Sequence, residues 1–393
     1  MKARRRLKPD HQSGSGFISR YHLVIALLVV LTAFSAVHGR RVIANYSTYQ
    51  WEDGIFIKHN AATIHSLGDC FTSPPVWPGL YRPLTTNLYY YLGRKLFSNN
   101  VGIHHLINVG VCLVNGLLLY LVCMVFLPRV WALVAAGIFV SRFSHVEVVL
   151  NTCEIQTLLA VFFSLVALNL FIRGRRLKRN WLVWAALIAF VLALFSKETS
   201  LVLPAIFIIY WWLFGERGGW RHYLAPLVAG GVWVILFAFF FRRVTSHQPT
   251  GFSYNFSLSH LLEGGATYLL TFFNSLSFRL ESIVMVPGIA GAAATGLVKA
   301  GFGLIVAVVV VFFLRYPGSR NRYSQSGRIV IFGSLFFLTA VAPYVVLESR
   351  LFMRYGYLGH AGLAISAAAV LREALAALAA TRGLQPQEPG NGP

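Results

Sequence analysis

Long runs of apolar residues, separated by short polar segments, dominate this sequence. They lie near residues 22–38, 102–126, 130–143, 155–172, 181–195, 200–214, 222–241, 296–314, 329–347 and 357–376. Most of them approach the roughly 20 residues that an α-helix needs to cross a bilayer. The pattern predicts an all-α polytopic membrane protein with about ten transmembrane helices. Residues 265–295 are apolar but interrupted by polar residues, proline and glycine. We expect an interfacial helix or an additional helix pair there, which gives a range of ten to twelve.

The composition changes this picture little. Apolar residues make up 56% of the 393 residues and charged residues 12%, against roughly half and a quarter in soluble domains. A net charge of +21 would point to nucleic acid in a soluble domain. Here the basic residues form short clusters between apolar runs, where they orient helices. We therefore expect membrane lipids among the partners and no nucleic acid.

Charge also predicts the orientation, because cytoplasmic loops collect Lys and Arg. With the N-terminus in the cytoplasm, ten helices place 20 of the 34 basic residues on the cytoplasmic side, but only 4 of the 13 acidic ones. The extracytoplasmic side then holds a first loop of residues 39–100, rich in aromatic residues and expected to be structured, and a second long loop of residues 242–281. We expect one transmembrane catalytic domain over residues 1–376 and a short disordered cytoplasmic tail over residues 377–393.

Several polar residues that could carry chemistry fall on the predicted extracytoplasmic side. Glu52 and Asp53 are adjacent, so their side chains diverge and do not form a matched acid and base. One would act and the other support it, or both are solvated loop acids. Arg82 lies in a proline-stiffened turn and suits a phosphate or a lipid headgroup. The other candidates in the same compartment are His105, Asn108, Asn115, His145, Glu147, Glu154, Lys197, Glu198 and Arg354.

In these residues the chain resembles the GT-C class of membrane glycosyltransferases. It is most similar to the protein O-mannosyltransferase-like group, which includes the transmembrane and tetratricopeptide-repeat mannosyltransferases. The resemblance covers about residues 20–376. The matching segments are Tyr49–Asn60, Tyr81–Leu84, His105 with Asn108 and Asn115, His145–Val149, Ser196–Glu198 and Arg354–Gly362. The chain departs from the group's pattern in carrying Glu52 where Asp is commoner, in lacking the arginine that usually follows the second motif, and in having no such repeats.

The resemblance implies a GT-C-like fold and transfer of a sugar from a polyprenyl or dolichyl phosphate carrier, with inversion, to an acceptor hydroxyl outside the cytoplasm. Asp53 would be the carboxylate base, with Glu52 as the competing candidate. The donor phosphate would be held by Arg82, Lys197 and Arg354. Positioning of the acceptor or the base would fall to His145, Glu147, Glu198, His105 and Asn108. The acceptor would be a protein or a glycan.

No cofactor beyond the lipid-linked donor is expected. No residue spacing resembles a metal site, so none is assigned, and a divalent metal requirement stays open. Three alternatives remain: a lipid-linked glycan polymerase, a transporter or flippase of lipid-linked sugar, and a noncatalytic subunit of the same fold. A flippase predicts charges near the midplane of the membrane in two similar halves, and neither feature is present in the sequence. A bacterial inner membrane is the preferred location, with the endoplasmic reticulum membrane as the alternative.

Overall fold

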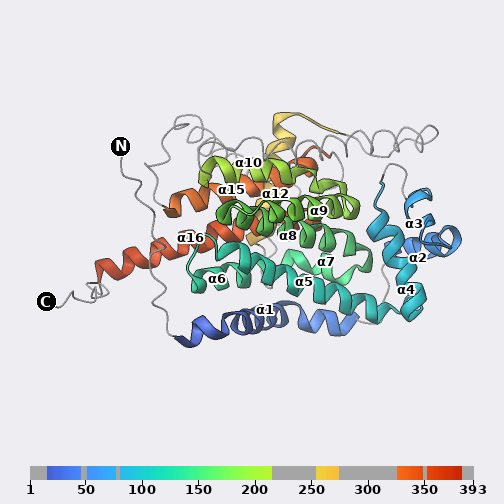
Figure 1. Cartoon of the computed structure of the whole chain (residues 1–393), viewed down its shortest axis with the longest axis horizontal. Helices are drawn as coiled ribbons and strands as arrows, with labels where there is room; N and C mark the ends of the chain where they lie inside the picture. The colour runs from blue at the N-terminus through green and yellow to red at the C-terminus, as the bar shows by residue number, and fades with distance from the viewer. Residues whose placement is uncertain are drawn as a thin grey trace, which may run out of the picture.

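The computed structural model describes residues 16–45, 51–76, 80–214, 254–273, 325–347 and 352–382. Regular secondary structure within these residues is helical, and the only β pairing in them is an isolated bridge between Tyr254 and Leu347. The long helices form a bundle in which most of them run roughly along one direction (Figure 1). They are α1 (Gly16–Asn45), α5 (Val101–Cys123), α6 (Arg129–Val140), α8 (Ile155–Leu177), α9 (Asn180–Ser196), α10 (Leu203–Phe214), α12 (Leu258–Phe273), α15 (Gln325–Val345) and α16 (Tyr357–Thr381).

Eight of the ten predicted apolar runs fall within the described residues, and each of the eight is helical. The other two, residues 222–241 and 296–314, lie outside the described residues. The interrupted stretch at 265–295 is described only as far as Phe273, where α12 ends. Helix α12 also occupies part of the segment expected as a second long loop. Helix α16 continues to Thr381, so the first residues of the expected disordered tail are helical.

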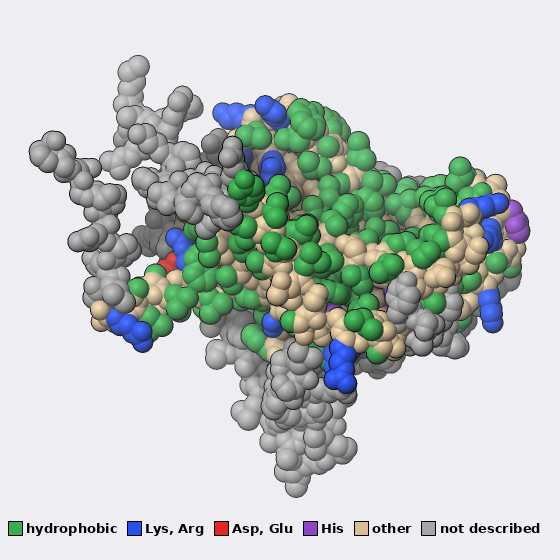
Figure 2. Space-filling view, turned by 90° about the horizontal axis from the view of Figure 1, so that it is seen from below, with side chains coloured by type: hydrophobic (Ala, Val, Ile, Leu, Met, Phe, Trp, Pro, Cys, Tyr) green, Lys and Arg blue, Asp and Glu red, His purple; other side chains and the backbone are tan. Residues whose placement is uncertain are grey.

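Five helices in the described part of the chain are long and apolar enough to cross a membrane. A sixth span results if α6 and the segment Phe143–Leu150, which meet at a bend of 56°, are taken together. Large apolar side chains on α1 are exposed, among them Leu23, Val24 and Leu28. Hydrophobic side chains cover much of the face seen in Figure 2, and Lys and Arg lie in small separate groups. Such a surface suits lipid, and the chain is an all-α membrane protein.

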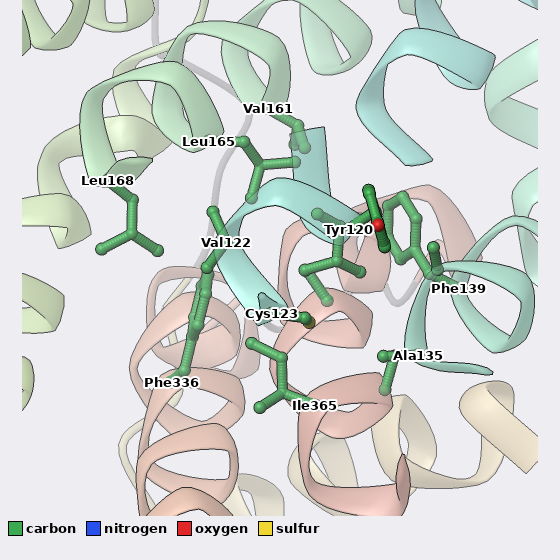
Figure 3. Close-up of a cluster of buried hydrophobic side chains, with 14 of the residues drawn as sticks. Tyr120, Val122, Cys123, Ala135, Phe139, Val161, Leu165, Leu168, Phe336 and Ile365 are labelled. Atoms are coloured by element: carbon green, nitrogen blue, oxygen red, sulfur yellow. The ribbon is translucent and has the colours of Figure 1, made fainter. Parts of the chain in front are cut away.

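Helices α5, α6, α8, α15 and α16 meet in the main hydrophobic core. Figure 3 shows Tyr120 and Val122 of α5, Phe139 of α6, Leu165 of α8 and Phe336 of α15 directed into one cluster, and all five are buried. Helices α15 and α16 pack especially closely where Gly333 faces Gly362. A Cβ atom on either glycine would overlap the backbone oxygen of the other. Small residues that let backbones approach are typical of helix contacts within membranes.

The connections between helices gather at two opposite ends of the bundle. At one end, the Arg176 guanidinium lies 5.9 Å from the centre of the Phe126 ring, and Gln325 donates a hydrogen bond to the Phe126 carbonyl at 3.2 Å. The ends of α5 and α8 and the start of α15 therefore lie together there. Arg176 lies in the last turn of α8 and Arg328 in the first turn of α15, so basic residues belong to this end.

The opposite end carries the short helices. The segment after α1 folds into α2 (Trp51–Thr63), α3 (Asp69–Thr72), the π-helix η1 (Pro83–Leu88) and α4 (Tyr89–Phe97), which lie together beyond the bundle in Figure 1. Asn60 donates to the Asn87 carbonyl at 2.8 Å, and Asn87 donates to the Cys70 carbonyl at 2.9 Å. These bonds fasten α2, α3 and η1 to one another. The remaining short elements at this end are η2 (Phe143–His145), α7 (Val146–Leu150), η3 (Thr152–Glu154), η4 (Glu198–Val202) and η5 (Met353–Gly356).

Candidate functional site

Lys197 lies at the junction between α9 and η4, where the chain leaves the helix in an extended conformation. Its ammonium donates a hydrogen bond to the Thr157 hydroxyl at 2.7 Å and lies 3.9 Å from the Glu154 carboxylate. The side chain is only 4% exposed. Burial lowers the pKa of Lys197 to about 8, although the nearby carboxylates of Glu154 and Glu198 oppose this shift. The lysine therefore changes charge close to neutral pH.

Arg82 precedes η1 and reaches the same region from the first loop. Its Nε donates to Oε2 of Glu198 at 2.7 Å, and its Nη2 bonds to the other oxygen of the same carboxylate. Its Nη1 donates to the side-chain oxygen of Gln156. A guanidinium that meets a carboxylate through two parallel bonds is among the stronger ionic contacts in proteins. This pair links η1 to η4, and the bond between Thr85 Oγ1 and the Ser196 carbonyl, at 2.8 Å, supports the same link.

Arg354 comes from η5, immediately before α16. Its Nε lies 3.2 Å from Oε1 of Glu154, and its Nη1 lies 3.5 Å from Oε1 of Glu147. The backbone N–H of Arg354 also donates to the Glu147 carboxylate at 3.1 Å. Arg354 therefore ties the start of α16 to α7 and η3.

These contacts form two sets of ion pairs, one of Arg82 with Glu198 and one of Lys197 and Arg354 with Glu147 and Glu154, which lie close enough to interact electrostatically. We call the six side chains together the ion-pair cluster: Arg82, Lys197, Arg354, Glu147, Glu154 and Glu198. Glu154 joins Lys197 to Arg354, and Glu198 holds Arg82. The three basic and three acidic side chains give a formal charge of zero. Burying charges is unfavourable unless they are paired and hydrogen-bonded, so this arrangement is strongly constrained by its neighbours.

A small hollow opens beside the ion-pair cluster. The Lys197 ammonium lies 5.1 Å from the ring centre of Tyr355 and 5.9 Å from that of Tyr344. The two tyrosine rings stack with their centres 4.3 Å apart. The hollow therefore presents a cation, hydroxyl groups and aromatic faces. Its lining consists of Thr157, Ala160, Val161, Lys197, Thr199, Ser200, Tyr344, Tyr355 and Leu358.

Asp53 lies on α2 and is fully buried. Its Oδ1 accepts a hydrogen bond from the backbone N–H of Cys153 at 2.8 Å. Cys153 directly precedes Glu154, so this bond fixes Asp53 against the segment that carries a central member of the ion-pair cluster. The backbone of Glu52 belongs to the first turn of α2, whereas the position of its side chain lies outside the described structure.

His145 does not join the ion-pair cluster through the contacts that the structure shows. Its Nε2 lies 3.1 Å from Nδ1 of His360, and the two rings stack. His360 also contacts the hydroxyl groups of Ser144 and Thr271, at 3.3 and 3.2 Å. This histidine pair is buried and joins η2, α12 and α16. His145 therefore contributes to helix packing.

The polar face predicted on α5 also packs against other helices. Asn108 donates to the Asn151 carbonyl at 2.8 Å, and Asn115 donates to the Leu158 carbonyl at 3.1 Å. The first bond holds the segment between Glu147 and Glu154 against α5, and the second holds the start of α8 against it. His105 is buried on the same helix, and its neighbour His104 contacts the Tyr89 hydroxyl at 2.6 Å. Asn108 thus positions the backbone of the site.

Glu154, Gln156 and Thr157 belong to the site, and none of them was assigned a role from the sequence. Glu154 contacts both Lys197 and Arg354, while Gln156 and Thr157 bind Arg82 and Lys197. The sequence offered one signal, a carboxylate at the opening of a long apolar helix, which is a position where charges are rare. Within the described residues, no group of three or more His, Cys, Asp or Glu is arranged to hold a metal ion.

Comparisons with known proteins add no family or relative. No protein-family model matches the chain, and no curated protein matches it.

Proposed function

We propose that this chain is a membrane glycosyltransferase of the GT-C class, which moves a sugar from a polyprenyl or dolichyl phosphate carrier to an acceptor hydroxyl. One observation carries the proposal. Arg82, Lys197 and Arg354 come from three distant parts of the sequence, yet they lie in two neighbouring sets of ion pairs at a single end of the helix bundle. Buried basic side chains at the edge of a membrane domain suit the phosphate of a lipid carrier.

The reaction needs few protein groups. The acceptor oxygen attacks C1 of the sugar and the C1–O bond to the phosphate breaks, so the bonding electrons pass to the phosphate oxygen. Prepositioned positive charge stabilises that developing charge. A carboxylate takes the proton from the acceptor, and Asp53 is the proposed base, with Glu52 as the alternative. Attack from the face opposite the phosphate inverts the configuration at C1.

The surroundings of the cluster agree with such a donor. The hollow beside Lys197 is faced by the stacked rings of Tyr344 and Tyr355. Apolar helix surfaces adjoin this end of the bundle and can accept the prenyl chain. In the proposed orientation this end faces away from the cytoplasm, in a bacterial inner membrane or, as the alternative, in the endoplasmic reticulum.

The experiment is a donor panel. Purified protein is incubated with radiolabelled polyprenyl phosphate sugars that differ only in the sugar, together with membrane extracts as a source of protein and glycan acceptors. We expect one sugar to be consumed and to appear in the acceptor fraction. Consumption of none of them, by protein shown to be folded in detergent, would contradict the proposal.

A further inference from the structure

Arg41 is a cation at this end of the bundle that belongs to neither set of ion pairs. It lies near the end of α1, on the face that packs against the bundle, because Phe34 and His38 are buried four residues apart and Arg41 follows three residues later. Its guanidinium lies 4.2 Å from the centre of the Phe143 ring. Arg41 is therefore half-buried and turned inward, between α1 and η2.

The Arg41 guanidinium has no hydrogen-bond acceptor among the described residues. Its Nη1 is buried and unpartnered, and no carboxylate in the described part of the chain pairs with it. A buried charged donor without an acceptor is unfavourable, and such groups in folded proteins usually bind a water or an ion. An acceptor from outside the chain would remove this cost.

The neighbouring arginine shows the contrast. Arg142 precedes Phe143, and its guanidinium donates to the Ile138 carbonyl at 2.8 Å and to the Phe272 carbonyl at 3.0 Å. These carbonyls lie near the ends of α6 and α12, so Arg142 caps two helices. Among the described residues, neither arginine contacts a carboxylate. Two positive charges therefore lie uncompensated here, whereas the ion-pair cluster is formally neutral, and an anion is attracted to this region.

The surroundings of Arg41 indicate that the anion belongs to a lipid. Among the five candidate spans in the described residues, α1 is the least buried, and it lies along one edge of the bundle (Figure 1). Its span runs from Tyr21 to Asn45, so Arg41 lies near the end of the span, at the depth of lipid headgroups. Ile43, two residues further on, is 80% exposed. Arg41 thus lies beside a surface that lipid covers.

We propose that Arg41, held by Phe143, binds the phosphate of an anionic phospholipid in the leaflet at this end of the bundle. A guanidinium presents its donors in one plane, so it can bind two phosphate oxygens while its flat face stays on an aromatic ring. The site is separate from the three cations assigned to the carrier phosphate. It does not depend on the proposed function.

Binding of dioleoylphosphatidylglycerol to the purified protein in detergent, followed by native mass spectrometry, tests the site. Arg41→Gln should weaken the tightest binding by about tenfold or more. Arg40→Gln is the matched control, since Arg40 is adjacent, carries the same charge and is exposed, and it should stay within about threefold of the native protein. Equal losses in the two variants would indicate general attraction of anionic lipid and would overturn the site. Native affinity in Arg41→Gln, even with a lower unfolding temperature, would overturn it as well.

A second pair of variants tests the geometry and decides the matter if Arg41→Gln does not fold. Arg41→Lys keeps the charge, but an ammonium cannot present two parallel donors, so binding should weaken by about threefold to tenfold. Phe143→Leu removes the ring that holds the guanidinium and should weaken binding by about threefold. Native affinity in folded Arg41→Lys would overturn the proposal.

Three further ligands identify the source of the phosphate. Inorganic phosphate at the same concentration should not displace dioleoylphosphatidylglycerol, and displacement would assign the site to a free anion. Dioleoylphosphatidylcholine, whose headgroup has no net charge, should bind at least about tenfold more weakly; equal binding would overturn the choice of an anionic lipid. Farnesyl phosphate, a short analogue of the proposed carrier, should bind Arg41→Gln as tightly as the native protein. A loss there would place Arg41 in the donor site, whereas native protein that binds no farnesyl phosphate would contradict only the proposed function.

Discussion

Replacing the proposed base by its isosteric amide gives the sharpest separation of chemistry from folding. In Asp53→Asn the side-chain oxygen can still accept the Cys153 N–H bond, which measures 2.8 Å in the native protein. A hydrogen bond to a charged group contributes roughly 1.5–3 kcal/mol, and a neutral one roughly 0.5–1.5 kcal/mol. We therefore expect the free energy of unfolding to fall by only about 1 kcal/mol.

The effect on sugar transfer should be far larger. An amide cannot take the proton from the acceptor, and loss of a positioned base typically lowers the rate about 100- to 10,000-fold. Transfer is measured as radiolabel passing from the carrier to the acceptor, and folding is followed by thermal unfolding in the same detergent. Asp53→Ala is the matched comparison. It leaves the buried Cys153 N–H without its acceptor and should cost about 1–3 kcal/mol more in stability.

Full transfer activity in folded Asp53→Asn would refute this role for Asp53. Glu52→Gln, made in parallel, should reduce transfer less. The reverse order of the two variants would make Glu52 the base and leave Asp53 as a buried acceptor for the start of η3.

Three further predictions follow from the described contacts. Burial lowers the pKa of Lys197 to about 8, so the lysine is charged below that pH and neutral above it. Affinity for farnesyl phosphate should therefore fall as the pH rises through about 8 or slightly higher. Lys197→Arg should remove this pH dependence. Arg82→Ala should lower the free energy of unfolding by about 3 kcal/mol, because it leaves the Glu198 carboxylate unpaired. The double variant Arg82→Ala/Glu198→Gln should recover much of this loss. Equal unfolding midpoints in the single and double variants would contradict the prediction. Gly333→Val should lower the free energy of unfolding by about 1–3 kcal/mol, because the added carbons overlap Gly362 and Ser366. Gly110→Val is the control, since no atom lies within 4 Å of the added Cβ, and its free energy of unfolding should be close to that of the native protein.

The helices were largely predictable because lipid imposes long apolar runs. Each run that falls within the described residues is helical, and several of the helices extend beyond their apolar runs. Helix α1, for example, continues to Asn45, beyond the apolar run. Its extension is held by His38, which contacts the Val140 carbonyl at 3.2 Å, and by the Arg41 guanidinium over the Phe143 ring. Such tertiary contacts leave no trace in hydropathy.

The site was predictable in part for a different reason. Alternating helices bring every second connection to the same end, so Arg82, Lys197 and Arg354 could be assigned to one compartment from charge alone. The carboxylates with which these three cations pair could not be predicted from charge. His145 was expected to act beside Glu147, but side chains two positions apart on a helical turn point to nearly opposite sides. In the structure Glu147 contacts Arg354, while His145 turns inward to His360.

Glu154 shows the limit of reasoning from the sequence. The sequence marks it only as a carboxylate at the opening of a long apolar helix, and nothing in its local sequence reveals that it lies between two cations from distant segments. The sequence likewise did not indicate that Gln156 and Thr157, in the first turn of α8, belong to the site. The partners of these three residues are Arg82 before η1, Lys197 before η4 and Arg354 in η5, which are distant in the sequence and come together only in the folded chain.

We propose that this end of the bundle transfers a sugar and does not merely bind or move a lipid-linked one. The most direct measurement follows the donor in vesicles that contain the purified protein and an acceptor. Loss of polyprenyl phosphate sugar and release of polyprenyl phosphate are quantified in the same sample. We predict equal amounts of the two, with both abolished in Asp53→Asn. Movement of intact lipid-linked sugar across the vesicle membrane, with no release of polyprenyl phosphate, would contradict the account and identify a transporter.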